Sequence, residues 1–419
     1  MSDLADRLGE LRERGLHRRL RMVSGPQGPR VLLDGKPVLL LCSNNYLGLA
    51  DHPRVREAAA EAAMRWGVGT GASRLISGTM KLHRRLEENL ASFKGQEAAL
   101  LFGSGYLANS GAIAALARNG EVVLSDQLNH ASIIDGCRLS RAETFAYRHC
   151  DLEHLEWGLR KAQGRGALIV TDGVFSMDGD VAPIEGLVEL ARRYDCRLMV
   201  DEAHATGTIG PGGRGSVAAA GLCEEVDVVV GTLGKALGSY GAYISGSRLL
   251  IDYLINVARP FIFSTGPALP VVAAAIAALE ILESNPHRVE RLQANARMMR
   301  EALLAEGLPV GPSETQILPV IVGDPVTTVE LCERALEMGV FAQGIRPPTV
   351  PEGTSRLRLA TMATHRGSEL VHAAKVLGDA ARDAGLLSDP APAPVQVAEA
   401  EDWVEPARHE AAPRLEEAA

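Results

Sequence analysis

The sequence has no surplus of positive charge. Its 419 residues include 43 lysines and arginines against 52 aspartates and glutamates, which gives a formal net charge of −9. Much of the imbalance lies at the C-terminus, where residues 388–419 contain eight acids and two arginines. A protein that binds the nucleic-acid backbone needs a basic surface, so we expect no nucleic-acid partner.

Long apolar runs and clustered cysteines are also missing. The most apolar stretch, residues 267–282, is too short and too rich in alanine to cross a bilayer. The N-terminus has no continuous apolar segment of the kind that a secretory signal needs. Six cysteines stand singly, without a CxxC pair or a Cys/His cluster at metal-ligand spacing. We therefore expect a cytoplasmic protein without a membrane partner, a disulfide framework or a metal ion.

The loops that bind nucleotide phosphates are missing as well. Residues 201–204 spell DEAH, as in a helicase motif, but no GxxxxGK[ST] loop accompanies them. Gly234 and Lys235 are followed by Ala236, and Val229 stands where such a loop would begin with glycine. No GxGxxG motif follows a predicted strand. These absences argue against nucleotide-driven motors, dinucleotide oxidoreductases and a plain purine-nucleotide-binding protein.

What the sequence does contain is an alternation of helical and extended patterns. With 46% hydrophobic residues, the chain can build a sizeable core. Short runs that are apolar on both faces are separated by helical stretches and occur at residues 98–102, 121–126, 167–173, 197–204, 226–232 and 241–246. This pattern predicts an α/β fold with a mostly parallel central sheet that helices cover on both sides.

The chain divides into four predicted segments. They are an N-terminal helix and hairpin (1–50), a large domain (51–284), a smaller α/β domain (285–387) and an acidic tail (388–419). Leucines at helical spacing predict the first helix over residues 2–21, and Asp34-Gly35 predicts the turn of the hairpin. The tail holds five prolines and nine alanines, a composition that predicts disorder.

Polar residues follow four of the predicted strands, in the segments 125–132, 171–180, 200–207 and 231–242. Taken alone, a histidine such as His130 is more often structural than catalytic, and an aspartate at a strand end is often a helix cap. Together the four segments place an acid, a base, an amine and several hydroxyl groups at one edge of the sheet. This is the edge at which α/β proteins bind ligands.

Pyridoxal phosphate needs this set of groups: an amine, a carboxylate for the ring nitrogen, donors for the phosphate and a ring stacked on its face. Lys235 is the predicted amine, and Asp201 is the predicted partner of the ring nitrogen. The other predicted contacts are His204 at the phenolic oxygen, His130 stacked on the ring, and phosphate donors from the glycine turn 102–109, Thr232 and Ser176.

Several longer motifs resemble those of the α-oxoamine synthase family of fold-type I pyridoxal-phosphate enzymes. They are SNNYLGL (43–49), GASRLISGT (71–79), FGSGYLAN (102–109), LNHAS (128–132), DGVFSMDGD (172–180), VDEAH (200–204), TLGKALG (232–238), ARPFIFST (258–265) and IRPPTVPEGTSRLR (345–358). The resemblance covers about residues 15–385. The last motif is the most discriminating, because it is similar to the branch that condenses L-alanine with a pimeloyl thioester.

The resemblance implies roles for individual residues. It implies that the cofactor is attached to Lys235 and that Lys235, His130 and Asp201 are catalytic. The implied cofactor contacts are Gly105, Tyr106, His130, Ser176, Asp201, His204, Thr232 and Lys235. The implied substrate contacts are Arg358 at the amino-acid carboxylate, Thr349 and His130 at the bound substrate, and Arg18 at the distal carboxylate of the acyl chain. Arg19 and Arg21 stand close enough in sequence to replace Arg18.

The implied activity is a decarboxylative condensation that gives 8-amino-7-oxononanoate in biotin biosynthesis. The implied assembly is a homodimer that completes the site across its interface, and the pimeloyl group can arrive on coenzyme A or on acyl carrier protein. One alternative is a glycine C-acyltransferase of the 2-amino-3-ketobutyrate ligase type. Another is a relative that binds the cofactor only structurally, against which the chain retains Lys235, Asp201, His130 and Arg358 together. Ala205 and the STGPA sequence at 264–268 depart from the usual pattern of the alanine branch.

Overall fold

The computed structural model describes residues 3–13 and 16–387, which form two compact units. The large unit contains residues 49–176 and 181–289, and the small unit contains the other described residues. The predicted disorder of the tail 388–419 lies outside the described residues.

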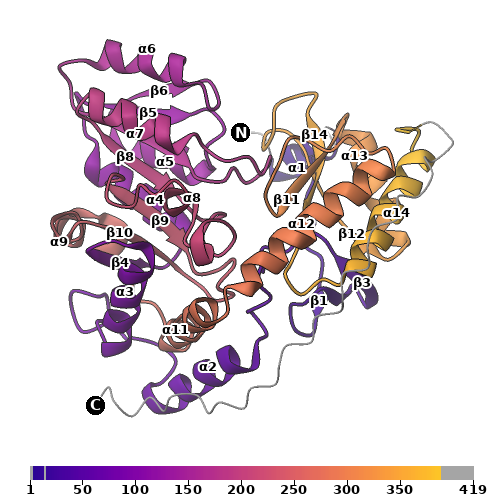
Figure 1. Cartoon of the computed structure of the whole chain (residues 1–419), viewed down its shortest axis with the longest axis horizontal. Coiled ribbons are helices and arrows are strands. Elements are labelled where there is room, and N and C mark those ends of the chain that lie inside the picture. Colours follow the sequence, from indigo (N-terminus) through magenta and orange to yellow (C-terminus); the bar gives the residue numbers. More distant parts are fainter. Residues whose placement is uncertain (1–2, 14–15, 388–419) are drawn as a thin grey trace. The chain divides into compact units, whose positions relative to one another are not determined.

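A seven-stranded sheet forms the centre of the large unit (Figure 1). Its strands, in spatial order, are β4 (Ala98–Phe102), β10 (Ala242–Gly246), β9 (Val228–Thr232), β8 (Arg197–Asp201), β7 (Ala167–Asp172), β5 (Val122–Asp126) and β6 (Glu143–Tyr147). Only β10 runs against the others, since it pairs antiparallel with both β4 and β9. The predicted α/β fold with a mostly parallel sheet is therefore confirmed, and all six predicted runs form strands.

Helices cover both faces of this sheet, as predicted. They are α2 (Pro53–Trp66), α3 (Lys81–Lys94), α4 (Gly105–Leu116), α5 (Ala131–Ser140), α6 (Leu152–Ala162), α7 (Ile184–Arg193), α8 (Ser216–Ala219), α9 (Arg248–Val257), α10 (Arg259–Ile262) and α11 (Leu269–Ser284). One buried cluster joins α4, α5, α9 and α10 to one sheet face, and a second joins α6 and α7 to the opposite face.

Local sequence explains where α3 forms and where it ends. Leu82, Leu86, Leu90 and Phe93 recur on one helical face, and all four are buried. Gly95 then adopts a left-handed conformation with φ of 66°, which a residue without a side chain accepts easily and which stops the helix. Helix α3 therefore presents its last residue, Lys94, to the interior of the large unit, where that side chain is buried.

The apolar stretch 267–282 largely coincides with α11, most of whose residues are buried in the large unit. No single helix among the described residues is long and apolar enough to cross a membrane. Within the described part of the chain, one bent pair of helices, α11 and the next helix, α12, reaches the necessary length and hydropathy.

The small unit contains two smaller sheets. One has the order β1 (Val23–Ser24), β2 (Arg30–Leu33), β3 (Lys36–Leu40), β12 (Val340–Phe341), and the other has the order β11 (Ile317–Gly323), β14 (Ser355–Ala360), β13 (Gln343–Ile345). The remaining helices are α1 (Leu4–Glu13), α12 (His287–Ala305), α13 (Pro325–Glu337) and α14 (Gly367–Asp383). One buried cluster joins α12, α13 and α14 to strands of both sheets and forms the core of this unit.

The N-terminal predictions were correct for the hairpin and wrong for the extent of the helix. Strands β2 and β3 pair antiparallel, and Asp34 and Gly35 form the turn with positive φ angles of 49° and 81°. Helix α1 ends at Glu13, and residues 16–22 are not helical. None of the residues of α1 is buried, so no core contact supports a longer helix.

Candidate active site

Lys235 lies in the connection between β9 and β10. The backbone of this loop is fixed by two hydrogen bonds, from Leu233 N to Gly241 O (2.9 Å) and from Ser239 N to Leu233 O (2.8 Å). The half-buried Lys235 side chain places its amine 2.8 Å from His204 Nε2. The fold thus brings together the amine and a histidine that the sequence predicted as cofactor contacts.

Asp201 is the last residue of β8 and is buried. Its Oδ2 accepts a hydrogen bond from Asn109 Nδ2 at 2.6 Å, and its Oδ1 accepts one from Ala203 N at 2.9 Å. Asn109 lies on α4 and also donates to Ser132 Oγ at 2.9 Å. The carboxylate is therefore held through both of its oxygens.

His130 caps the N-terminus of α5. Its backbone N–H donates to Asp172 Oδ2 at 2.9 Å, and its ring Nδ1 lies 2.7 Å from Ser132 Oγ, so both backbone and ring are fixed. Desolvation lowers the pKa of His130; Asp201 opposes this effect and Lys235 adds to it. Because the pKa lies below its usual value, the imidazole is mainly neutral at pH 7.

The glycine turn at 102–109 opens α4. Ser104 caps the helix, and its Oγ accepts a hydrogen bond from Leu107 N at 3.3 Å. Open space surrounds the position of a Cβ on Gly105, and Tyr106 next to it is exposed and bonds Asp135 through its hydroxyl. The first N–H groups of a helix have no partner inside the helix, which makes this end of α4 suited to an anion.

The two predicted hydroxyl contacts come from the chain at or after the ends of β9 and β7, the two strands that flank β8. Thr232 ends β9, donates to Gly241 O at 3.1 Å and accepts from Gly234 N at 3.2 Å. Ser176 is half-buried and follows β7. All eight predicted cofactor contacts therefore belong to the large unit.

These groups fit pyridoxal phosphate. Lys235 supplies the amine, Asp201 a fixed carboxylate, and the helix start at Gly105 backbone N–H groups that open space leaves accessible to an anion. Asn109 Oδ1 is buried and has no hydrogen-bond partner among the described residues. The donor set is thus the one that the cofactor requires.

Sequence reasoning missed three residues that hold this site, namely Asn109, Ser132 and Asp172. Asp172 ends β7 directly opposite Asp201 on β8. Burial raises the pKa of Asp172 well above its usual range and the Asp201 carboxylate raises it further, against lowering by the His130 N–H and by Lys235. The available signal was a polar residue near the end of a predicted strand or helix. Which of these residues contact one another depends on the order of the strands, which the sequence does not give.

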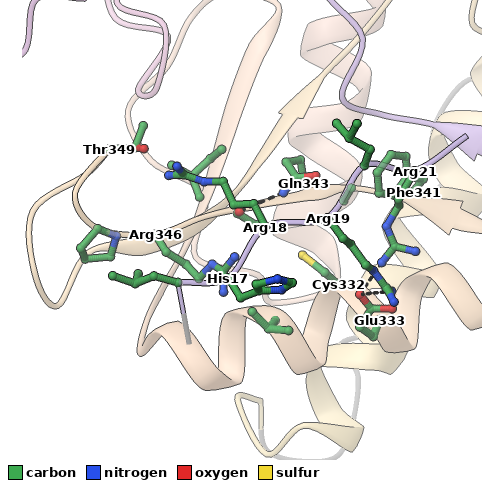
Figure 2. A pocket seen from close by; sticks show the side chains of 17 residues that line it. His17, Arg18, Arg19, Arg21, Cys332, Glu333, Phe341, Gln343, Arg346 and Thr349 are labelled. Carbon is green, nitrogen blue, oxygen red and sulfur yellow. Dashed lines mark hydrogen bonds and ion pairs between the residues drawn. The ribbon is translucent and has the colours of Figure 1, made fainter. Parts of the chain in front are cut away.

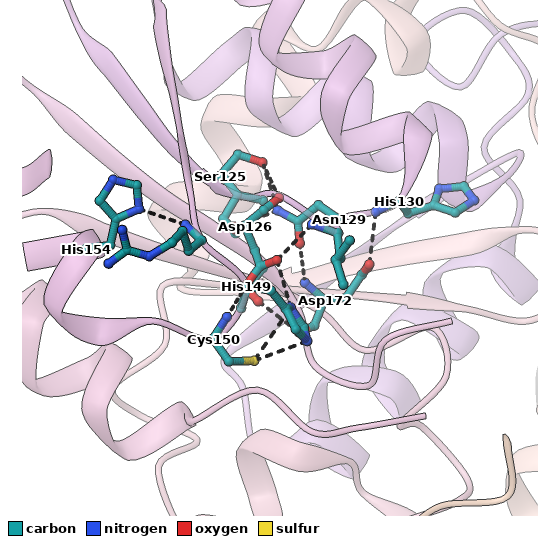
Figure 3. Close-up of polar contacts among 12 residues, drawn as sticks. Ser125, Asp126, Asn129, His130, His149, Cys150, His154 and Asp172 are labelled. Carbon is teal, nitrogen blue, oxygen red and sulfur yellow. Dashed lines mark hydrogen bonds and ion pairs between the residues drawn. The ribbon is translucent and has the colours of Figure 1, made fainter. Parts of the chain in front are cut away.

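A second polar cluster ties the ends of β5 and β6 together (Figure 3). Asp126, His149 and Cys150 place ligand-type atoms within 4.8 Å of one another, a grouping that the sequence did not indicate. Asp126 Oδ1 lies 3.0 Å from His149 Nδ1 and accepts from Leu128 N at 2.9 Å, and Oδ2 accepts from Cys150 N at 2.8 Å. Both carboxylate oxygens are thus engaged in hydrogen bonds that join the two strand ends, and we assign no metal to them.

Arg358, the predicted contact of the amino-acid carboxylate, belongs to the small unit. It lies on β14 and is buried. Its guanidinium donates to Tyr46 Oη at 3.2 Å and to Asn44 Oδ1 at 3.4 Å. Both partners come from the SNNYLGL motif, so the fold brings two of the resembling motifs into contact within this unit.

A cavity of about 630 Å³ in the small unit contains Arg18 and Thr349 in its lining (Figure 2). Arg19 and Arg21 also line it, and both pair with Glu333. Arg18 is exposed, and of the three arginines it is the one that no ion pair within the described residues engages. The structure thus brings two predicted substrate contacts to one cavity and distinguishes Arg18 from its neighbours.

A family model described as aminotransferase class I and II matches residues 36–377. The chain belongs to this family. Among solved structures of similar fold, serine palmitoyltransferase from Sphingomonas wittichii has a TM-score of 0.88 at 32% identity, over 92% of this chain and 100% of that chain. A serine palmitoyltransferase from S. paucimobilis, with bound PLP, has a TM-score of 0.87 at 32% identity over 92% of this chain and 98% of that chain. Membership of the aminotransferase family, together with this likeness of fold, confirms the predicted fold-type I architecture and pyridoxal-phosphate dependence.

Within the aminotransferase class I and II family, the chain is similar to curated 8-amino-7-oxononanoate synthases. The one from Citrifermentans bemidjiense is 52% identical over 390 residues, which are 92% of this chain and 100% of that protein. The one from Geobacter sulfurreducens is 53% identical over 92% of this chain and 99% of that protein. A solved 8-amino-7-oxononanoate synthase from Francisella tularensis has a TM-score of 0.72 at 25% identity, over 83% of this chain and 98% of that chain. The predicted resemblance to this branch is confirmed.

Proposed function

We propose that this protein condenses L-alanine with a pimeloyl thioester, with loss of CO₂ and release of the thiol, to give 8-amino-7-oxononanoate for biotin biosynthesis. The curated relatives at about half identity carry the name of that product's synthase, and they match nearly the whole chain. The glycine C-acyltransferase alternative is not favoured, because these relatives belong to the alanine branch.

The observation that carries the proposal is the lysine site of the large unit. The Lys235 amine lies 2.8 Å from His204, and the Asp201 carboxylate is fixed by Asn109 at 2.6 Å. When bound, pyridoxal phosphate supplies an electron sink that makes the Cα–H and Cα–carboxylate bonds of an amino acid breakable. Asp201 is the residue that keeps the ring nitrogen protonated, as that electron sink requires.

The chain's own residues would then handle protons and position groups. The amine of Lys235 would remove the Cα proton of alanine and later return one. His204 holds the lysine side chain and would also contact the phenolic oxygen, and the neutral His130 would stack on the ring and contact substrate. Gly105, Tyr106, Thr232 and Ser176 complete the contacts to the cofactor.

The small unit supplies the proposed contacts to the substrates. Arg358, fixed by Tyr46 and Asn44, takes the amino-acid carboxylate in a bidentate pair. Thr349 and Arg18 share the cavity of about 630 Å³, which can accept an acyl chain with a distal carboxylate. Pairing of Arg19 and Arg21 with Glu333 supports Arg18 as the arginine that meets this carboxylate.

A cytoplasmic homodimer is the proposed assembly. The large unit exposes bulky apolar side chains in its resembling motifs, among them Ile76 (81% exposed) and Phe263 (71% exposed). Ser73 and Thr265 form a β-bridge, so these two motifs lie side by side, and contiguous exposed apolar surface marks an interface. The six cysteines stand singly in the sequence, a usage that supports a reducing compartment.

One assay tests the substrate assignment. Thiol release is measured with alanine or glycine as acceptor, crossed with pimeloyl or acetyl thioester as donor. We expect the alanine and pimeloyl pair to give the highest kcat/KM. A preference for glycine with acetyl-CoA would replace our assignment with the glycine C-acyltransferase. Comparing pimeloyl-CoA with pimeloyl-acyl carrier protein in the same assay identifies the carrier.

A further inference from the structure

Lys94 and Glu202 form an ion pair inside the large unit that no step of the proposed reaction uses. Lys94 is the last residue of α3, Glu202 directly follows β8, and their side chains are 2% and 0% exposed. The Lys94 amine donates to Glu202 Oε2 and to the carbonyl oxygen of Arg214, and lies 3.4 Å from Thr206 Oγ1. A full charge of each sign is therefore buried next to the lysine site.

The chain wraps around the Glu202 carboxylate. Its Oε1 accepts hydrogen bonds from Ser216 Oγ at 2.7 Å and from Val217 N at 2.8 Å. Gly215 has φ of 104°, and a Cβ at this position would overlap the carboxylate. The two ends of segment 202–217 are thus joined by hydrogen bonds to the Glu202 side chain, and Lys94 connects this segment to α3.

This fastened segment begins with two cofactor contacts. Asp201 immediately precedes Glu202, and His204 follows two residues later. The Glu202 backbone oxygen accepts from Ala205 N at 3.0 Å and Thr206 N at 2.8 Å, so the turn that carries His204 starts at Glu202. The side chain of Asp201 contacts α4 through Asn109, whereas that of Glu202 contacts α3 through Lys94.

The charges of this pair depend on each other. Burial alone would lower the pKa of Lys94, but the Glu202 carboxylate reverses this effect and leaves the pKa above its usual value. Removing one partner would leave an unpaired charge in the interior, whereas removing both would not. Buried ion pairs add little net stability compared with apolar residues, and in some proteins their benefit is a single defined conformation.

We propose that Lys94 and Glu202 are positioning residues that fix Asp201 and His204 against the cofactor. The pair sets the distance of β8 and the following turn from α3, and so determines how tightly and in which protonation state the cofactor is held. The proposal rests on the cofactor contacts proposed for Asp201 and His204 and is independent of the identity of the substrates.

The test uses the holoenzyme and no substrate. Lys94→Met, Glu202→Gln and the double variant are compared with wild type by the dissociation constant of pyridoxal phosphate, the pH profile of its visible absorption, and urea unfolding. We expect each single substitution to raise the dissociation constant at least about tenfold and to shift the pH profile. The double variant should lie closer to wild type than either single variant, because no unpaired charge remains.

Glu87→Gln is the matched control. Glu87 lies on the same helix α3 and forms a comparably buried pair with Arg74 at 2.9 Å, but it contacts no residue of the segment 202–217 among those described. We expect it to lower the free energy of unfolding without changing either cofactor measurement. An Asp201→Asn variant whose pH profile matches wild type would instead refute the role of Asp201.

The proposal is overturned if Glu202→Gln loses free energy of unfolding as the control does, while its dissociation constant for pyridoxal phosphate and the pH profile of the bound cofactor match those of wild type. Additive effects of the two single substitutions in the double variant would overturn it as well, since the residues would then act independently. If Glu202→Gln does not fold, Lys94→Met decides by the same criteria. Substrate assays can fail without affecting any of these measurements, so the two failures are distinguishable.

Discussion

Charged and polar side chains are buried in the lysine site of the large unit but exposed in the cavity of the small unit. In the lysine site, Asp201, Asp172 and His204 are buried, and hydrogen bonds from neighbouring elements fix them. In the cavity, Arg18 and Arg19 are exposed, and Glu333 pairs with Arg19 at the surface. The proposed chemistry therefore rests on groups with little freedom, whereas the proposed acyl-chain selection rests on groups that water already solvates.

This contrast predicts the size of mutational effects. Substituting a buried, hydrogen-bonded group causes a large loss of free energy, because its partners lose their hydrogen bonds as well. Exposed ion pairs contribute little, because water and salt screen them. Substitutions in the lysine site should therefore change rates by orders of magnitude, and substitutions in the cavity should change substrate preference slightly.

The largest effect is expected for Lys235→Ala. Loss of the amine removes both the attachment point of the cofactor and the base, so kcat for thiol release should fall at least about 10³-fold. Borohydride reduction of wild type followed by peptide mapping should find the pyridoxyl group on Lys235. A label on another lysine would show that the site is wrongly assigned.

A smaller loss is expected for Asp201→Asn. The amide keeps the shape of the side chain but removes the negative charge beside the ring nitrogen. Exchange of the alanine Cα proton with solvent should slow by about 10²- to 10³-fold, while cofactor still binds. Proton exchange followed by NMR measures this step directly. Exchange at the wild-type rate would contradict the role given to Asp201.

Asp172 should make the cofactor-free protein less stable as the pH rises. Its pKa is raised in the folded state, so above about pH 4 the folded protein retains a proton that the unfolded chain has lost. The free energy of unfolding should fall from that pH up to the raised pKa, by at most about 1.4 kcal/mol per pH unit. Urea unfolding between pH 5 and 8 should show this decrease for wild type relative to Asp172→Asn. Parallel curves would mean that Asp172 titrates normally.

The smallest effect is expected in the cavity. Arg18→Ala should raise KM for pimeloyl thioester by about fivefold or less, because the arginine is exposed. Short neutral acyl thioesters should be unaffected. Arg19→Ala is the matched control, since its guanidinium pairs with Glu333, and it should leave KM unchanged. Equal effects of both variants would mean that the distal carboxylate contacts the arginines of the cavity as a group and not Arg18 alone.

Sequence patterns predicted the elements of the large unit well, for a physical reason. Its parallel strands are buried on both faces, so each appears as a short apolar run between helices. Strand β6 was missed because it lies at the edge of the sheet and most of its residues are exposed or half-buried. An edge strand of this kind has no apolar run to detect.

Contacts between elements could not be predicted in the same way. Lys235, Asp201 and His204 could be identified because their residue types indicate cofactor chemistry. Asn109 contacts Asp201 because α4 packs against the central sheet, which its residue type does not indicate. Asp172 faces Asp201 because β7 and β8 are neighbours, which depends on strand order. Helix α1 was predicted too long because leucine spacing does not tell whether a core is available to receive it.

The antiparallel pairing of β9 with β10 has a consequence for how the site assembles. The loop 233–241 that carries Lys235 joins two neighbouring strands, with Thr232 opposite Ala242. A short loop between adjacent strands closes with little loss of chain entropy, whereas the contact of Asn109 with Asp201 joins residues 92 positions apart. The amides of β9 and β10 should therefore resist hydrogen exchange even without cofactor, so that the reactive lysine stands on the earliest-formed and most persistent part of the site.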